Sequence, residues 1–446
     1  MGEKPGHSSP NPSSIWVILA LAFGLRLGWA LSVENGIDSN FMFDATYYFF
    51  TGQSLAAGEG FSTTPGVPTA YFPPGYPLIL ASAFVVLGAQ SFVPVLINLF
   101  AGTATCWVTY KLGSLTYGPK SGLTAAAVLA FWPSHVYATS ATMSEVVFTF
   151  LLTLVIYRFC LIASTQRGEN WRSWIFLGLL LGFTSLVRGA GLLFFCALGL
   201  ALFINYGLRR SAVRKALLLL VPLLVVNGLW VVRNQVTMGA PIVLATSGAW
   251  SFFNAHNEEA DGGQSWSIGR YRKKLFGDQL TGETTMENDV LLHRLQMRYA
   301  AEYMLTHPLE EILQVPSRLY RLNRGDDWPL AWVGHRTPIE GTQRHTISYL
   351  HPAIDPVLGQ LANGYYIVFF VLGTAGLVLG FFRSNRLAWI IPLTVIYFHG
   401  LHGILFFGTE RFHAPFVPEL ALGAGLVFAE VRVRVPSLRS SGPGRE

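Results

Sequence analysis

Charge and cysteine are both scarce in this sequence. Only 13% of its 446 residues are Asp, Glu, Lys or Arg, whereas a soluble globular chain carries about 25%. Hydrophobic residues make up 51% of the chain and fall into long runs, which short basic clusters separate. This pattern excludes a soluble enzyme, a disordered chain and a coiled coil, and it predicts an all-α polytopic membrane protein. The net charge of +6 follows from where Lys and Arg lie around the membrane, so we expect no nucleic-acid partner.

The sequence also lacks the motifs that bind nucleotides. It contains no GxxxxGK[ST] and no GxGxxG in a strand–turn–helix setting. Asp326 and Asp327 form a DDW rather than the DxD of nucleotide-sugar enzymes, and we interpret this segment as a loop. The cysteines Cys106, Cys160 and Cys196 lie in apolar runs, where none is placed for a disulfide framework or a CxxC metal site. Any activated substrate must therefore arrive from the membrane or from the outer medium.

Ten apolar segments are interpreted as membrane spans, because a helix of about 20 residues crosses the hydrocarbon layer. They are residues 15–33, 92–112, 122–140, 145–163, 173–187, 189–207, 216–232, 360–382, 387–407 and 414–431. The first span is longer than the apolar region of a cleavable signal peptide, so we expect an uncleaved anchor. The stretch 173–207 is too long for one helix and predicts a tight hairpin with Arg188 at its turn.

Basic residues set the predicted orientation. With the N-terminus inside, the short basic loops are cytoplasmic, and residues 34–91, which contain no Lys or Arg, lie outside. The apolar segment 73–88 is short, and we expect it at the outer interface. The predicted organisation is a cytoplasmic tail (1–14), an N-terminal transmembrane catalytic core (15–232) that includes the first outer loop (34–91), an extracytoplasmic region (233–359), C-terminal transmembrane helices (360–431) and a cytoplasmic tail (432–446).

Two carboxylates stand at predicted outer helix ends. Asp44 begins a polar-aromatic segment that predicts a helix ending near Gly58. Its apolar surroundings would suit a general base, and the alternative is a helix N-cap. Glu145 begins the fourth span, where the helix dipole alone would favour it. Because the topology puts both carboxylates on the outer face, the two can converge.

Three arginines lie at outer span ends, against the usual bias of basic residues toward the cytoplasm. They are Arg188, Arg233 and Arg411. Together they would form an anion site, above all for phosphate. The alternatives are contact with phospholipid headgroups and, for Arg411, pairing with Glu410. Arg26 lies inside the first span, where charge is costly and predicts a functional or interhelical role, with a partner that the sequence does not name.

Weaker candidates complete the predicted site. Residues that would line the substrate are Tyr47, Tyr71, Asn234, His256, Asn257 and His413. His399 and His402 are expected to be satisfied by neighbouring helices. The segment 287–306 has an apolar face with helical spacing, which predicts an outer amphipathic helix that packs on the membrane surface or on the spans.

A series of motifs in a fixed order points to a family. They are Asp44 with its aromatics and GEGF (58–61), PPGYPLILA (73–81), Ser144-Glu145, Arg188, the W-x-x-RN…G-x-P-x-x-L-x-T-x-G segment (230–248) and Arg411 before a Pro-rich apolar segment. In this order the chain resembles the GT-C membrane glycosyltransferases of the dolichyl-phosphate-mannose–protein mannosyltransferase-like group, which includes the aminoarabinose transferases. Many members have Asp-Glu where this chain has Asp44-Ala45.

The resemblance implies a GT-C fold and transfer of a monosaccharide from a polyprenyl-phosphate-linked donor to a protein, lipid or glycan acceptor. Asp44 would be the general base, Glu145 would orient the acceptor, Asp44 or a metal, and Arg233, Arg411 and Arg188 would bind the donor phosphate. A divalent cation, Mg or Mn, is left open, with Asp44 and Glu145 as its ligands. The expected location is a prokaryotic plasma membrane with the site facing outside.

Two other functions remain open. A transporter or flippase for a lipid-linked anion would also use intramembrane charge such as Arg26, although the paired halves of such proteins are not seen here. A ligase or polymerase would move whole oligosaccharides from lipid-linked donors on the same face. Donors of different size separate that case from monosaccharide transfer.

Overall fold

The computed structural model describes residues 13–33, 44–64, 66–164, 170–264, 268–279, 286–333, 335–338, 345–348, 354–383 and 386–434. Within them, seven helical segments are long and apolar enough to cross a membrane. The predicted all-α polytopic membrane class is therefore confirmed, while the count of ten spans stays a prediction. The tails 1–14 and 432–446 lie almost wholly outside the described residues.

Each predicted span overlaps a helix. These helices are α1 (Ser13–Ser32), α4 (Phe92–Thr116), α5 (Pro119–Ala130), α7 (Glu145–Ser164), α8 (Trp171–Val187), α9 (Ala190–Tyr206), α10 (Arg210–Met238), α15 (Asp355–Arg383), α16 (Ile390–Gly400) and α17 (Val417–Arg434). Large apolar side chains remain exposed along them, such as Trp16, Leu31 and Val236. Exposure of this kind suits helices whose outer surfaces face lipid.

The third predicted span is not one continuous helix, contrary to the prediction for residues 122–140. Helix α5 ends at Ala130, and α6 (Pro133–Tyr137) and η1 (Ala138–Ser140) follow it. Pro133 has no backbone N–H and restricts the residue before it to extended conformations, and Trp132 is indeed extended at φ −68° and ψ 111°. The chain therefore turns at Trp132. The predicted hairpin, by contrast, is present, since only Arg188 and Gly189 separate α8 from α9.

The segment predicted to be the first outer loop, which keeps that name below, folds as a helix pair with a small hairpin. It contains α2 (Asp44–Ala56), β1 (Ser62–Thr64), β2 (Val67–Pro68) and α3 (Gly75–Leu87). The helix predicted from Asp44 is therefore present. Helix α3 has 13 residues, fewer than the ~20 of a typical span. It packs on α2 and α8, and its Gly75 lies so close to the end of α8 that an added Cβ would be 2.6 Å from the Leu186 carbonyl carbon.

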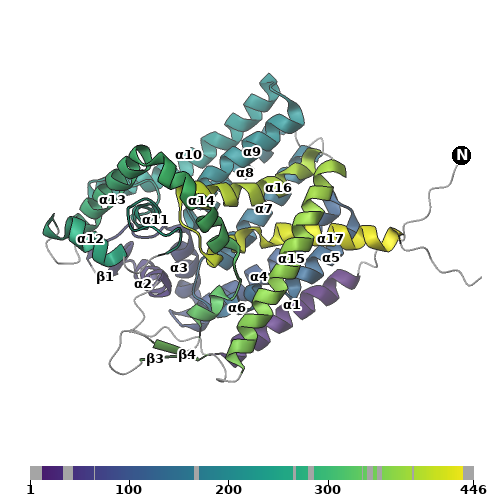
Figure 1. Ribbon diagram of the computed structural model, residues 1–446, viewed down its shortest axis with the longest axis horizontal. Coiled ribbons are helices and arrows are strands. Elements are labelled where there is room, and N and C mark those ends of the chain that lie inside the picture. The colour runs from purple at the N-terminus through teal and green to yellow at the C-terminus, as the bar shows by residue number, and fades with distance from the viewer. Residues whose placement is uncertain are drawn as a thin grey trace, which may run out of the picture.

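The segment predicted to be the second outer region, which keeps that name below, is a group of helices at the same end of the bundle as α2 and α3. Its elements are α11 (Ser247–Ala255), α12 (Ile268–Phe276), η3 (Gly277–Gln279), α13 (Met286–Thr306), α14 (Pro308–Asn323), η4 (Trp328–Trp332), β3 (His335–Pro338) and β4 (His345–Ser348). Figure 1 shows α11 to α14 gathered on the left with α2 and α3, whereas α1 begins and α17 ends on the right. The helix predicted over 287–306 is α13.

The last spans contain short irregular turns, two of which, η6 and η7, bring polar residues to this end. Around α16 lie η5 (Arg386–Trp389) and the π-helical turn η6 (Leu401–Leu405), and η7 (Glu410–Phe416) precedes α17. Helices α15 and α17 approach closely, because an added Cβ at Gly376 would lie 1.8 Å from the Gly423 carbonyl oxygen. Close approach of this kind is typical of small residues between membrane helices. It fixes α17, and thereby the η7 turn that leads into it.

Candidate active site

Four charged side chains from distant parts of the sequence meet at the end of the bundle where the outer loops lie. Arg411 Nη1 in η7 donates to Asp44 Oδ2 at the start of α2 over 2.7 Å, and Arg411 Nε lies 3.0 Å from Glu145 Oε1 at the start of α7. Arg188 Nη1, just after α8, lies 2.6 Å from the same Glu145 oxygen. We call these four residues the carboxylate–arginine cluster.

Two hydroxyl groups extend the cluster. Arg188 Nη1 also donates to Ser144 Oγ over 3.1 Å, and Tyr48 OH lies 3.2 Å from the same oxygen. Both carboxylates stand in the first turn of a helix, where the helix dipole stabilises negative charge. The N-termini of α2 and α7 and the two arginines therefore all place positive charge or partial positive charge beside the carboxylates.

The two carboxylates differ in exposure. The Asp44 side chain is 24% exposed, whereas Glu145 is only 1% exposed beneath the two arginines. Two carboxylates and two guanidinium groups balance in charge, so the cluster is neutral as it stands. Only Asp44 is open enough to meet a hydroxyl group of an incoming acceptor.

Aromatic rings surround the arginines. The Arg411 guanidinium lies 5.3 Å from the Trp332 ring centroid, and Phe412 lies 5.6 Å from Arg411 and 5.9 Å from Arg188. Cation–π contacts of this kind orient a guanidinium group and lower the local polarity. Charge interactions in the cluster are thereby stronger than they would be in water.

Arg233 lies outside the cluster. Its Nη1 donates to the Thr69 carbonyl over 2.8 Å and its Nη2 to the Phe61 carbonyl over 3.3 Å, and its guanidinium stacks 4.9 Å from the Trp230 ring. These contacts hold the β1–β2 hairpin of the first outer loop against α10. Phosphate binding by Arg233 stays a prediction, and its present contacts are with protein carbonyls.

The predicted aromatic residues form a rim near Asp44. Tyr47 stacks on Tyr71 with centroids 4.7 Å apart. Burial raises the pKa of Tyr71, and the nearby carboxylates of Asp44 and Asp289 raise it further. Burial likewise raises the pKa of Asp289 on α13, with Arg272 acting in the opposite direction. The two outer regions therefore meet beside Asp44.

The other predicted lining residues are fully buried among protein groups. Asn234 Nδ2 donates to the Ile242 carbonyl over 2.8 Å, and Asn257 Nδ2 donates to the Phe253 carbonyl over 2.7 Å. His256 lies 2.8 Å from Glu311 and 3.1 Å from the Leu405 carbonyl.

His413 is buried as well, 2.8 Å from Asp326. Direct contact of these four residues with a substrate stays a prediction.

Asp326 is a buried residue whose importance the sequence did not reveal. Its DDW segment is indeed a loop, but the side chain is fully buried. Asp326 Oδ2 accepts hydrogen bonds from Trp132 Nε1 and Ser134 Oγ, both over 2.6 Å. Its partners lie at the Pro133 helix break, 192 and 194 residues away, so no local sequence pattern marks Asp326 as important.

Two of the arginine alternatives are resolved by geometry. Glu410 pairs with Arg324 rather than with Arg411. Arg26 is fully buried, and its Nη1 donates to the Ala22 carbonyl over 3.0 Å and to the Ala130 carbonyl, at the end of α5, over 3.4 Å. Arg26 therefore joins α1 to the C-terminal end of α5, where the helix dipole favours a cation.

The cluster does not have the donor set of a metal centre. Within the described ranges, no group of three or more His, Cys, Asp and Glu side chains could hold a metal ion. Asp44 and Glu145, the ligands that the sequence offered for Mg or Mn, are each already paired with arginine. The residues present therefore do not fit a divalent cation, which prefers several anionic oxygens free of competing cations.

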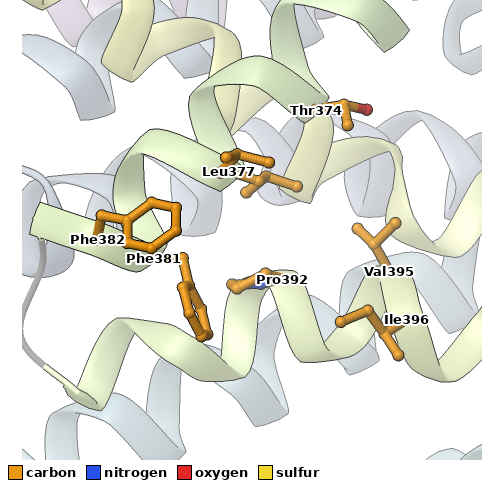
Figure 2. A pocket seen from close by; sticks show the side chains of 8 residues that line it. Thr374, Leu377, Phe381, Phe382, Pro392, Val395 and Ile396 are labelled. Atoms are coloured by element: carbon orange, nitrogen blue, oxygen red, sulfur yellow. The ribbon is translucent and has the colours of Figure 1, made fainter.

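An apolar groove lies elsewhere in the bundle. It has a volume of about 340 Å³ and lies between α15 and α16, lined by Thr374, Leu377, Val378, Phe381, Phe382, Pro392, Val395 and Ile396. Figure 2 shows their side chains facing one another across it. Apart from the Thr374 hydroxyl its lining side chains are apolar, and no residue of the cluster takes part. The groove therefore carries no chemistry of its own.

Comparison with known proteins supports the fold and the family. Residues 72–232 match the family model described as dolichyl-phosphate-mannose-protein mannosyltransferase. No curated protein matches the sequence. Oligosaccharyltransferase AglB from Archaeoglobus fulgidus, in complex with an inhibitory peptide and a dolichol-phosphate, aligns with a TM-score of 0.52 and 15% identity over 97% of this chain. The chain covers 52% of that protein, about half its length.

Other solved structures are similar as well. The apo form of the same archaeal enzyme aligns with a TM-score of 0.50 and 13% identity, over 94% of this chain and 51% of that one. ArnT from Cupriavidus metallidurans in the apo state aligns with a TM-score of 0.46 and 12% identity, over 94% of this chain and 60% of that one. The family-model match over residues 72–232 and the fold shared with the archaeal enzyme agree with the resemblance to GT-C membrane glycosyltransferases that the motifs predicted.

Proposed function

We propose that this protein transfers a monosaccharide from a polyprenyl-phosphate-linked donor to an acceptor on the extracytoplasmic face of the membrane. The observation that carries the proposal is the carboxylate–arginine cluster. It combines one accessible carboxylate with two guanidinium groups at the end of a membrane bundle. Such an arrangement can remove a proton from an acceptor and bind the phosphate that leaves.

Asp44 is the general base in this proposal. Its side chain is the more exposed of the two carboxylates, so it can reach an acceptor hydroxyl. Glu145, buried beneath Arg188 and Arg411, holds both guanidinium groups in place and does not contact the acceptor. General base catalysis contributes about 10²–10⁴-fold to a rate.

The reaction is a single displacement. Asp44 accepts the proton of the acceptor hydroxyl, whose oxygen forms a bond to the anomeric carbon of the sugar. The bond from that carbon to the phosphate oxygen breaks with inversion, and its electron pair stays on the lipid phosphate. A phosphate diester is a weak base, so its departure needs stabilisation by cations rather than a general acid.

Arg411 and Arg188 provide that stabilisation. A donor phosphate at Arg411 would take over the Nη1 group that now donates to Asp44, which leaves Asp44 Oδ2 open to the acceptor hydroxyl. Donor binding would thus prepare the base. Arg233 is a weaker candidate, because its guanidinium already binds the Thr69 and Phe61 carbonyls.

The lipid part of the donor follows from the setting of the site. The cluster lies where membrane helices end, and the archaeal oligosaccharyltransferase of the same fold binds a dolichol-phosphate. The acceptor, which is a protein, lipid or glycan, would bind against residues 233–359, since Asp289 of this region and Asp44 are both close enough to Tyr71 to raise its pKa. A prokaryotic plasma membrane with the site outside fits the distribution of basic residues.

A transfer assay tests this function. Purified protein in lipid vesicles receives radiolabelled polyprenyl-phosphate monosaccharides, with a membrane extract as acceptor. Wild type is compared with Asp44→Asn and with Asp261→Asn, a matched control that removes an Asp paired with Arg321 at 2.9 Å outside the cluster. We expect transfer by wild type and Asp261→Asn, and a loss of about 10²–10⁴-fold with Asp44→Asn.

Three results would contradict parts of the proposal. Near-normal turnover by Asp44→Asn would show that Asp44 is not the general base. Transfer from oligosaccharide-charged lipids alone favours an enzyme that moves whole oligosaccharides. The archaeal oligosaccharyltransferase has a fold similar to that of this chain. Movement of labelled lipid across the bilayer without any transfer favours a transporter or flippase.

A further inference from the structure

Helix α14 presents an apolar stripe that no described residue covers. Ile312 is 66% exposed and Leu313 is 69% exposed, and Leu309 and Tyr320 are similarly open. With 3.6 residues per turn, these four positions fall within roughly a third of the helix circumference, on one side of α14. We call Leu309, Ile312, Leu313 and Tyr320 the α14 stripe.

The other side of α14 is fixed to the end of the ninth span. Leu319 and Val315 lie against Gly403 in η6, and the buried Arg318 donates from Nη1 to the Gly403 and Ile404 carbonyls over 3.4 and 3.3 Å. Ile404 itself is 58% exposed. The α14 stripe is therefore attached to the end of a span at which another apolar side chain, Ile404, is exposed.

The direction of α14 also suits a membrane surface. In Figure 1 it runs across the ends of α16 and α17 rather than along them. Its stripe ends at Tyr320 and is followed by Arg321 and Arg324, and aromatic and basic residues are favoured at the boundary between lipid and water. Glu310, on a different side of the helix, is exposed as well, as expected for the side that faces water.

From these contacts we propose that the α14 stripe lies in the outer interface of the bilayer, where lipid covers it. The occupant is lipid rather than protein, because the stripe continues the exposed surface of a membrane span and is joined rigidly to it. Burial of large apolar side chains at such an interface stabilises the position of an amphipathic helix. The outer region would thereby be held at a fixed height above the membrane. This proposal does not depend on sugar transfer.

Spin labels can measure directly whether lipid covers the α14 stripe. Cysteine is introduced as Ile312→Cys, Leu313→Cys or, as the control, Glu310→Cys, in a Cys196→Ser background that removes the exposed native thiol. In vesicles, collisions of the label with oxygen, which concentrates in lipid, are compared with collisions with a water-soluble nickel chelate. We expect oxygen to dominate at 312 and 313, and the nickel chelate to dominate at 310.

Either of two other results would overturn the proposal. Nickel accessibility at 312 and 313 equal to that at 310 would place the stripe in water. Low accessibility to both reagents would show that protein covers it, such as a second copy of the chain. Thermal unfolding of each labelled variant checks that the fold is retained.

A separate observation concerns the buried pair Asp326 and His413. His413 Nδ1 lies 2.7 Å from the Leu322 carbonyl and its Nε2 lies 2.8 Å from Asp326 Oδ1. A carbonyl can only accept, so Nδ1 carries a hydrogen, and one more proton lies between Nε2 and Oδ1. With Trp132 and Ser134 donating to the other Asp326 oxygen, this fully buried pair has a single well-defined arrangement.

The pair is connected to Arg411 along two routes. His413 stands two residues after Arg411 in η7. Asp326 lies two residues before η4, whose Trp332 ring is 5.3 Å from the Arg411 guanidinium. Tyr366 of α15 stacks on His413 at 4.4 Å and keeps its ring in place. A shift of His413 would therefore move η7, and Arg411 with it.

We infer that Asp326 and His413 are positioning residues that set the Arg411 guanidinium against Asp44 and Glu145, an inference that rests on the proposed function. Neither side chain is exposed, so each would act through Arg411 and not on the substrate. Small displacements of a catalytic group reduce rates strongly, by as much as about 10²-fold for 1 Å.

The test is a double-mutant cycle. His413→Gln is made in wild type and in Arg411→Lys, and the control is Arg318→Lys, which perturbs another buried ion pair, at 2.7 Å from Glu311. We expect His413→Gln to lower kcat by about 10- to 100-fold in wild type and by less than about 3-fold in Arg411→Lys. Arg318→Lys should cost the same factor in both backgrounds.

Equal losses from His413→Gln in both backgrounds, or no loss in either, would overturn the positioning role. The same cycle followed by thermal unfolding needs no substrate, and we expect the shifts in Tm of His413→Gln and Arg411→Lys to be non-additive there too. If wild type transfers no sugar, the proposed function fails while this second measurement still tests the pair. Additive shifts would then contradict it.

Discussion

Arg411 and Arg233 were equivalent in the sequence but have different surroundings in the structure. Arg233 lies in the last turns of α10 and Arg411 lies in η7, just before α17, and both contact the first outer loop. Arg411 meets the carboxylates of Asp44 and Glu145, at 2.7 and 3.0 Å. Arg233 meets only the Thr69 and Phe61 carbonyls among its backbone partners, at 2.8 and 3.3 Å.

The difference distinguishes an arginine that can bind a substrate phosphate from one that stabilises the fold. A guanidinium that faces carboxylates can exchange them for a phosphate, because both are anions of similar geometry. One that holds backbone carbonyls cannot leave them without loosening the loop. An arginine at an outer span end is therefore a candidate for phosphate binding only when its partners are exchangeable.

The largest difference is expected when each arginine is replaced by lysine. Arg411→Lys keeps the charge but loses the two-sided contact to Asp44 and Glu145, so kcat should fall by about 10²–10³-fold. Steady-state kinetics with the lipid donor, together with Tm, provide the measurement. A loss below about 5-fold would remove Arg411 from the phosphate site.

Arg233→Lys should lower the stability of the protein more than it lowers kcat. One ammonium group cannot replace donors to both the Thr69 and Phe61 carbonyls, so the β1–β2 hairpin should loosen and Tm should fall. We expect kcat to fall by less than about 10-fold, as for a group outside the reacting centre. A kcat loss as large as that of Arg411→Lys, at unchanged Tm, would restore Arg233 as a phosphate ligand.

Ser144→Ala is expected to have a smaller effect. It removes the hydroxyl that accepts from Arg188 Nη1 over 3.1 Å and contacts Tyr48. Arg188 keeps its ion pair with Glu145, so kcat should fall by about 3- to 10-fold, in line with one hydrogen bond of about 1 kcal/mol. The comparison is with Ser82→Ala, whose hydroxyl donates to the Leu78 carbonyl on exposed α3 and should leave kcat unchanged.

The smallest effect is expected from removal of divalent cations. Since arginine neutralises both Asp44 and Glu145, transfer should be unchanged when a chelator replaces Mg or Mn in the assay. Loss of activity that added Mg or Mn restores would instead support the cation that the sequence left open.

The sequence predicted most of the long helices well, because long apolar runs are typical of helices in a membrane protein. Helix ends near Val187 and Ala190 followed from one Arg in a long apolar stretch. The break at Pro133 was missed, since the surrounding residues are all apolar enough to continue a span. Proline at that point ends the helix for local steric reasons, which hydropathy does not measure.

The site was predictable only in part. The predicted topology put Asp44, Glu145, Arg188 and Arg411 on one face of the membrane. It could not separate them from Arg233, because all five lie at predicted outer helix ends. Asp326 was hidden for a different reason. Its partners Trp132 and His413 are 194 and 87 residues away, and only the folded chain brings them together.

The most direct test of this account is a kinetic cycle between Asp44→Asn and Arg411→Lys. If the two side chains act as one catalytic unit, the double variant should be about as slow as the slower single variant, because loss of either part disables the unit. Losses in kcat that multiply in the double variant would show that Asp44 and Arg411 act independently, and would contradict the cluster as the centre of the reaction.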